Sequence, residues 1–236
     1  RLTPTGGDSI LLNFPSFPLP EVGYPLIAAS DHSLYGTFPS GGSSNTGEIY
    51  QATLAGQLQI VADFPANGLS EPVPPLLEAE DGNIYGTTNH NQVFRYNLAS
   101  HQLSRVYQFT SGPSQPICFC QLIEGMDGKL YGVSPVGGNF PGVGAVFSLD
   151  IGLPKPLPII TGMFPAVGPV GRRVILWGKY LLGATAVSFN GMPAVKVVPT
   201  SVQSVQVTVP TGATTGPVSI TTANGSFTTT KSFTVQ

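Results

Sequence analysis

The sequence predicts an all-β protein with two domains: propeller-type repeats over residues 1–157 and a second β domain over residues 158–236. The 29 glycines and 23 prolines separate short apolar runs, which is typical of tight turns between short strands. One six-residue motif recurs three times in the first part of the chain. No window shows a sustained helical apolar period, and no apolar run is long enough to span a membrane.

The repeated motif begins with Asp and ends with Tyr-Gly. Its copies are Asp31–Gly36, Asp81–Gly86 and Asp127–Gly132, which begin 50 and 46 residues apart. Each copy follows a short apolar run and precedes further strand-like segments. Four strands in about 45–50 residues is the size of one propeller blade. The first domain is therefore expected to be a partial or small β-propeller of about three blades.

The first residues resemble a piece of a further repeat. Asp8–Phe14 matches the fourth strand of a blade, whereas the third copy has no clear fourth strand before Pro154. This strand can close the chain's own repeats, pair with a neighbouring chain by strand addition, or mark a truncated longer protein. Its apolar side chains are candidate assembly residues: Ile10, Leu11, Leu12 and Phe14.

A family resemblance covers residues 1–153. The motif, the Gly-Gly loops at Gly41 and Gly137, and a following Gly-x-Ile/Val-Tyr/Phe segment resemble the GloVer tandem repeat of large bacterial secreted proteins. The second copy departs from this pattern, because Thr88–Gln92 replaces the Gly-Gly loop. The resemblance implies a propeller-like fold and an extracellular location, and says little about activity.

The second domain shows strands with one buried face. Apolar and polar residues alternate in Val205–Val209 and Val218–Thr222, and Asn190-Gly191 is a strong hairpin signal. The segment order resembles the IPT/TIG immunoglobulin-like domain. That resemblance implies an immunoglobulin-like β-sandwich used as a spacer or binding platform, often on bacterial surfaces. Trp177 is interpreted as a core residue, with a sugar-stacking platform as the alternative.

No catalytic or metal site is expected. The histidines His32, His90 and His101 lack the partners of a catalytic or metal-binding motif. Glu78 and Glu124 hold equivalent positions in two repeats, so a carboxylate pair for glycoside hydrolysis is an alternative to a solvated strand face. Cys118 and Cys120 are interpreted as two free, buried thiols, since no further ligand completes a metal site. No cofactor is implied.

Charge is unevenly divided between the domains. Residues 1–157 hold all 12 acidic and five basic residues, a formal charge of −7, whereas residues 158–236 hold five basic residues, a formal +5. Opposite charges favour docking between the domains or head-to-tail contact between subunits. Arg172 and Arg173 are candidate assembly residues. The scattered bases argue against a nucleic-acid partner.

Two functions are consistent with these features. The first is a secreted or cell-surface, non-enzymatic structural or adhesive protein that self-associates, as a filament subunit joined by head-to-tail contacts. The alternative is a glycan-binding accessory region of a larger extracellular carbohydrate-active protein. In that case the loops at one end of the blades would meet the sugar, through Asn45, Asn89, His90, Asn139 and Phe140. Neither function requires membrane insertion.

Overall fold

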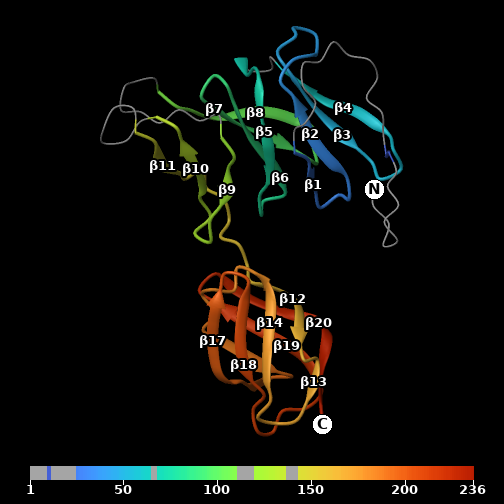
Figure 1. The fold of residues 1–236 in the computed structure, drawn as a ribbon, viewed down its shortest axis with the longest axis vertical. Coiled ribbons are helices and arrows are strands. Elements are labelled where there is room, and N and C mark those ends of the chain that lie inside the picture. The colour runs from blue at the N-terminus through green and yellow to red at the C-terminus, as the bar shows by residue number, and fades with distance from the viewer. Residues whose placement is uncertain (1–9, 12–24, 65–67, 111–119, 137–142) are drawn as a thin grey trace. The chain divides into compact units, whose positions relative to one another are not determined.

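The structure is a computed structural model that describes residues 10–11, 25–64, 68–110, 120–136 and 143–236. The chain forms two compact units, residues 1–154 and residues 155–236 (Figure 1). The described residues form β-strands and turns without an α-helix, so the prediction of an all-β protein is confirmed. Within these residues, no helix has the length and apolar character needed to cross a membrane.

The described residues of the first unit form three separate antiparallel sheets, one for each copy of the motif. The first sheet has the order β1 (Ile27–Ala28), β2 (Leu34–Phe38), β3 (Glu48–Ala52), β4 (Leu58–Asp63). The second has the order β5 (Pro72–Glu78), β6 (Asn83–Thr88), β7 (Gln92–Asn97), β8 (Gln102–Gln108). The third has three strands among the described residues, β9 (Ile123–Glu124), β10 (Leu130–Ser134) and β11 (Ala145–Leu149). We call these sheets, with their loops, repeats 1, 2 and 3.

The Asp and Tyr of each motif are joined by a hydrogen bond. In repeat 1, one carboxylate oxygen of Asp31 accepts the backbone N–H of Ser33 (2.9 Å) and the other accepts the hydroxyl of Tyr35 (2.8 Å). The same bonds recur at the other two copies, where Asp81 accepts the N–H of Asn83 and the hydroxyl of Tyr85, and Asp127 accepts the N–H of Lys129 and the hydroxyl of Tyr131. The Asp therefore fixes the turn and satisfies the phenol of the next strand, which explains why both residues recur.

The Gly that follows each Tyr leaves room for an aromatic ring. A side chain on Gly86 would overlap the ring of Phe94, which crosses it from the neighbouring strand β7, and would lie 2.9 Å from Leu76. The same arrangement recurs in the other repeats, with Gly36 under Tyr50 and Gly132 under Phe147. The close approach of the ring requires glycine here.

The repeats pack face to face. Tyr35, Ile49 and Phe64 of repeat 1 pack against repeat 2, in a cluster that includes Ile84 and Phe94. The other face of repeat 2 packs against repeat 3 through the following residues: Tyr85, Val93, Phe109, Leu122, Leu130 and Leu149. Repeat 2 thus buries one face against repeat 1 and the opposite face against repeat 3, as propeller blades do.

Two sequence interpretations concern parts of the first unit that the structure describes incompletely. Ile10 and Leu11 belong to no described strand, and the backbone of Leu11 lies beside Gly56 in the turn between β3 and β4. Leu12 and Phe14 lie outside the described residues. Cys120 is disulfide-bonded, so the interpretation of two free thiols is wrong. Cys118, the only other cysteine of the chain, lies outside the described residues.

The second unit is a sandwich of two sheets around one core. One sheet has the order β12 (Ile159–Phe164), β14 (Arg173–Lys179), β18 (Ser204–Thr208), β17 (Val195–Ser201). The other has the order β13 (Val167–Gly168), β20 (Gly225–Val235), β19 (Gly216–Thr222), β15 (Ala186–Phe189), β16 (Met192–Pro193). Alternating residues from both sheets form the core, which includes Leu176, Val207, Phe189 and Ile220. Asn190 and Gly191, both with positive φ, form the predicted two-residue hairpin turn between β15 and β16.

Candidate functional site

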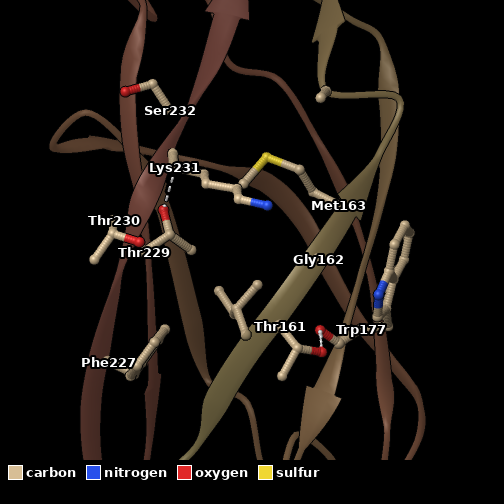
Figure 2. Close-up of a pocket in the computed structure, with 11 residues that line it drawn as sticks. Thr161, Gly162, Met163, Trp177, Phe227, Thr229, Thr230, Lys231 and Ser232 are labelled. Atoms are coloured by element: carbon tan, nitrogen blue, oxygen red, sulfur yellow. Dashed lines mark hydrogen bonds between the residues drawn. The ribbon is translucent and has the colours of Figure 1, made fainter.

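A groove lies in the second unit between strands β12 and β20 (Figure 2). β12 is the edge strand of its sheet, and β20 pairs on that side only with the two-residue strand β13. The two edges face each other without pairing over the length of the groove. The space between them has a volume of about 400 Å³, which is within the size range of small-ligand sites.

Irregularities in both strands shape the groove. The register of β12 on β14 shifts between Ile160 and Gly162, so Thr161 bulges and its hydroxyl donates to the backbone oxygen of Trp177 at 3.3 Å. On β20, the three residues 229–231 lie opposite the single residue Val218 of β19. The Thr229 hydroxyl accepts the backbone N–H of Val218 (2.9 Å) and donates to the carbonyl of Lys231 (2.6 Å). Bulges of this kind redirect side chains at sheet edges.

The groove combines an apolar base with a polar rim. Met163 and Phe227 are partly buried and pack against the core of the sandwich. Exposed hydroxyls of Thr161, Thr230 and Ser232 surround them. In Figure 2 the side chains of Met163 and Lys231 lie between the two strands, and Trp177 stands on the far side of β12 from β20. The remaining lining residues are Ile160, Gly162, Ala166 and Thr229.

Trp177 is exposed, which corrects the interpretation that it belongs to the core. Val174 and Leu176 occupy the inward positions of β14, so the alternation of the strand turns Trp177 outward, with 43% of its surface exposed. Its partner across the strands is Gly162, and a side chain at that position would overlap the indole. The indole therefore covers the backbone of β12 on one side and presents the rest of its surface to solvent. An aromatic ring over a strand glycine is a known stabilising arrangement.

The predicted loop residues that the structure describes in the first unit bond either within their own loop or to a neighbouring loop. The side-chain oxygen of Asn45 accepts the backbone N–H of Gly41 (3.0 Å), within its own loop. Asn89 donates to the carboxylate of Glu71 (3.3 Å), and His90 Nδ1 lies 3.0 Å from the hydroxyl of Ser70. Asn139 and Phe140 lie outside the described residues. The described loop residues thus engage their own neighbours within the first unit.

Glu78 and Glu124 each bind the backbone of the preceding repeat. The carboxylate of Glu78 accepts the N–H of Ser30 (2.9 and 3.1 Å) and its hydroxyl (2.6 Å). Glu124 accepts the N–H of Glu80 at 3.0 Å. Ser30 and Glu80 directly precede the motif aspartates of repeats 1 and 2. The two carboxylates are therefore clamps between repeats, each engaged at a different boundary, and they do not face one substrate.

The other candidate residues have no partner that identifies a site. Arg172 and Arg173 are exposed at the start of β14, at the end of the strand away from Trp177. Among the described residues, no three His, Cys, Asp or Glu side chains are close enough together to hold a metal ion.

The groove was missed by sequence reasoning because two bulges create it, although the alternation of Val174 and Leu176 could have placed Trp177 on the surface.

Comparisons with known proteins identify one family. The model of the Gloeobacter/Verrucomicrobia repeat matches residues 1–154. No curated protein sequence matches the chain.

Several solved structures are similar to parts of the chain. An auxiliary nutrient binding protein of Bacteroides ovatus has 24% identity and a TM-score of 0.31, over 35% of this chain and 22% of that one. SGBP-B from a complex xyloglucan utilization locus of Bacteroides uniformis has 14% identity and a TM-score of 0.34, over 69% and 49% of the chains. A fungal alcohol oxidase of the AA5 family has 11% identity and a TM-score of 0.37, over 86% and 51%. The aligned part spans about half of these structures or less.

Proposed function

We propose that this chain, which belongs to the Gloeobacter/Verrucomicrobia repeat family through residues 1–154, is a non-enzymatic, glycan-binding part of a secreted or cell-surface protein. The observation that carries the proposal is the exposed indole of Trp177 beside the hydroxyl-rimmed groove of the second unit. In this proposal the sandwich of residues 158–236 is an IPT/TIG-type binding platform, and the repeats are the scaffold that carries it.

The groove suits the chemistry of a sugar. A pyranose ring has an apolar C–H face and a rim of hydroxyls that donate and accept hydrogen bonds. An exposed indole offers a flat apolar surface for the C–H face, and its own N–H is a donor. The hydroxyls of Thr161, Thr230 and Ser232 can exchange hydrogen bonds with the sugar rim. Lys231 adds a cation at the same site, which favours an acidic sugar or a sugar ring oxygen.

The non-enzymatic part of the proposal rests on what the residues of the groove can do. The polar side-chain groups that line it are hydroxyls, one ammonium and the indole N–H, and no carboxylate or imidazole lines it. Glycoside hydrolysis generally requires a pair of carboxyl groups about the scissile bond. The groove can therefore hold and orient a sugar, and it lacks the acid and base that would cleave one.

Binding is tested by affinity electrophoresis in gels that contain xyloglucan, mixed-linkage β-glucan, starch or pectin, followed by calorimetric titration with oligosaccharides of the retarding polymer. Trp177→Ala is expected to weaken binding at least about fivefold, since contact with an aromatic ring contributes on the order of 1 kcal/mol. Thr230→Val, which removes a rim hydroxyl while keeping its volume, is expected to weaken binding less.

The matched control is Ile175→Ala. Ile175 lies two residues away on the same strand and the same face, is 44% exposed, and does not line the groove. The Ile175→Ala variant should leave glycan binding unchanged. Equal losses in the Trp177 and Ile175 variants would show that the fold, rather than the groove, had been damaged. Absence of retardation in every gel would refute the proposal.

Self-association is the second candidate function, and the charge distribution favours it. The formal −7 of residues 1–157 and +5 of residues 158–236 make contact between unlike parts of two copies electrostatically favourable. Arg172 and Arg173, exposed on the second unit, would take part in such a contact. Sedimentation velocity over a series of salt concentrations tests this, because a contact between opposite charges weakens as salt is added.

A further inference from the structure

The surface of repeat 3 that faces away from repeat 2 is exposed where its counterparts are buried. Val133 and Val146 form a cross-strand pair on β10 and β11, and 61% and 74% of their surfaces are exposed. The same strand positions in repeat 1 are the pair Thr37–Ile49, and in repeat 2 the pair Thr87–Val93. All four of those residues are at most 1% exposed.

A second row of side chains repeats the contrast. Ile123 on β9 pairs with Tyr131 on β10. Ile123 is 58% exposed, whereas its counterparts Ile27 and Leu77 pack against the clusters between repeats. Tyr131 is half-buried, and its counterparts Tyr35 and Tyr85 are fully buried. We call the surface made by Ile123, Tyr131, Val133 and Val146 the trailing face. A hollow of about 290 Å³ lies on it.

Repeat 1, at the opposite end of the repeat array, also exposes apolar side chains whose counterparts in the other repeats are buried. Leu26, just before β1, is 46% exposed. Leu76 and Leu122 occupy the same position in repeats 2 and 3. They are 3% and 2% exposed, because each packs against the preceding repeat. Leu34 of β2 is likewise more exposed than its counterparts Ile84 and Leu130. We call the surface made by Leu26 and Leu34 the leading face.

We propose that the trailing face of one copy docks onto the leading face of a second copy, so that repeat 1 of the second copy packs as a fourth blade. This proposal rests on self-association as the function, and it places the contact on apolar faces of the repeats rather than on the charged surfaces. The chain already makes this contact twice, between repeats 1 and 2 and between repeats 2 and 3. Among the described residues of the first unit, the two exposed faces are the unused halves of that same contact, and burying the apolar side chains of both drives the docking.

The contact between copies would join unlike surfaces. Such a heterologous contact gives a closed ring when the rotation from copy to copy closes, and an open fibre when it does not. It would also be weaker than the contacts within the chain. Ala28 of β1 stands where Glu78 and Glu124 clamp the backbone of the preceding repeat, so that bond is missing. We therefore expect assembly that depends on concentration.

The test is sedimentation velocity of the whole chain from micromolar to millimolar concentration. Wild-type protein should form species larger than a monomer. Val146→Asp on the trailing face and Leu26→Asp on the leading face should each weaken self-association at least about tenfold, as charges do in the centre of an apolar contact. Both residues are exposed in the single chain, so both variants should fold. Val202→Asp is the matched control, a half-exposed valine of the second unit.

Mixing the two variants gives the decisive result. Each retains the face that the other has lost, so an equimolar mixture should form a one-to-one dimer and nothing larger, while each variant alone stays monomeric. A wild-type chain that is monomeric at every concentration overturns the proposal. The proposal is also overturned if both variants assemble as the wild type does and added salt dissociates the assemblies. Self-association would then depend on the charged surfaces instead. Glycan binding should be unchanged in both variants, because neither residue lines the groove.

Discussion

Glu124 accepts a hydrogen bond from the backbone N–H of Glu80 at 3.0 Å, which joins the third repeat to the turn that opens the motif of the second. Burial raises the pKa of Glu124 above its ordinary 4.5, with a further contribution from the nearby carboxylates of Glu80 and Asp81. Burial and the neighbouring Asp63 raise the pKa of Glu48 in the same way. The folded first unit therefore binds protons at these sites more tightly than the unfolded chain does.

The first unit should lose stability as the pH rises just above 4.5. A raised pKa in the folded state contributes stability that is complete below the unfolded value and is lost as the pH passes the folded value. Urea unfolding at a series of pH values should show this slope, and Glu124→Gln should reduce it. Asp127 affects stability in a lower pH range. The Tyr131 hydroxyl lowers the pKa of Asp127 below 3.8, so the stability that the ionised Asp127 contributes is lost only as the pH falls below that value. A slope unchanged by Glu124→Gln would contradict the assignment.

Gly86→Ala should destabilise the first unit by about 1–3 kcal/mol, because the added methyl overlaps the ring of Phe94 in a packed core. Phe94→Leu should remove most of that overlap. The double variant is then expected to be less destabilised than the sum of the two single variants, by an amount that a double-mutant cycle in urea measures. Additive losses would mean that the glycine is required for another reason.

Tyr85→Phe should cost about 1.5–3 kcal/mol of unfolding free energy, since it removes a buried hydroxyl that donates to the charged Asp81 at 2.8 Å. Tyr131→Phe removes the same bond to Asp127 at a more exposed position and should cost less. Thermal unfolding of the two variants side by side checks the order. Equal losses would indicate that the hydrogen bond contributes independently of burial.

The unfolded, unreduced chain should react with no maleimide, because Cys120 is disulfide-bonded and the chain has two cysteines. After reduction, two labels per chain are expected by mass spectrometry. Reduction should also loosen the boundary between repeats 2 and 3, where the carbonyl of Cys120 accepts the Thr87 hydroxyl at 2.9 Å. Labelling before reduction would contradict the disulfide.

The recurring features could be predicted from sequence because they are local. Asp31 and Tyr35 lie within one turn and the following strand, so the motif identifies the bond that they make. The role of Glu78 and Glu124 lies between repeats and was missed, although their spacing of 46 residues equals that of the motifs they accompany. The groove depends on bulges at Thr161 and at residues 229–231, where the strands lose register. Gly162 borders the first bulge and Pro217 of β19 lies beside the second, but the bulged residues themselves, Thr161 and residues 229–231, include no glycine or proline.

Trp177 is the only tryptophan of the chain, and it lies in the second unit. Its fluorescence therefore reports the unfolding of residues 155–236 and the occupation of the groove, while Tyr35, Tyr85 and Tyr96, packed between the repeats, contribute near-ultraviolet circular dichroism that is lost when the first unit unfolds. The intact chain thus carries two separate optical signals. Changes made in the repeats can be followed without a label while the emission of the indole serves as an internal reference.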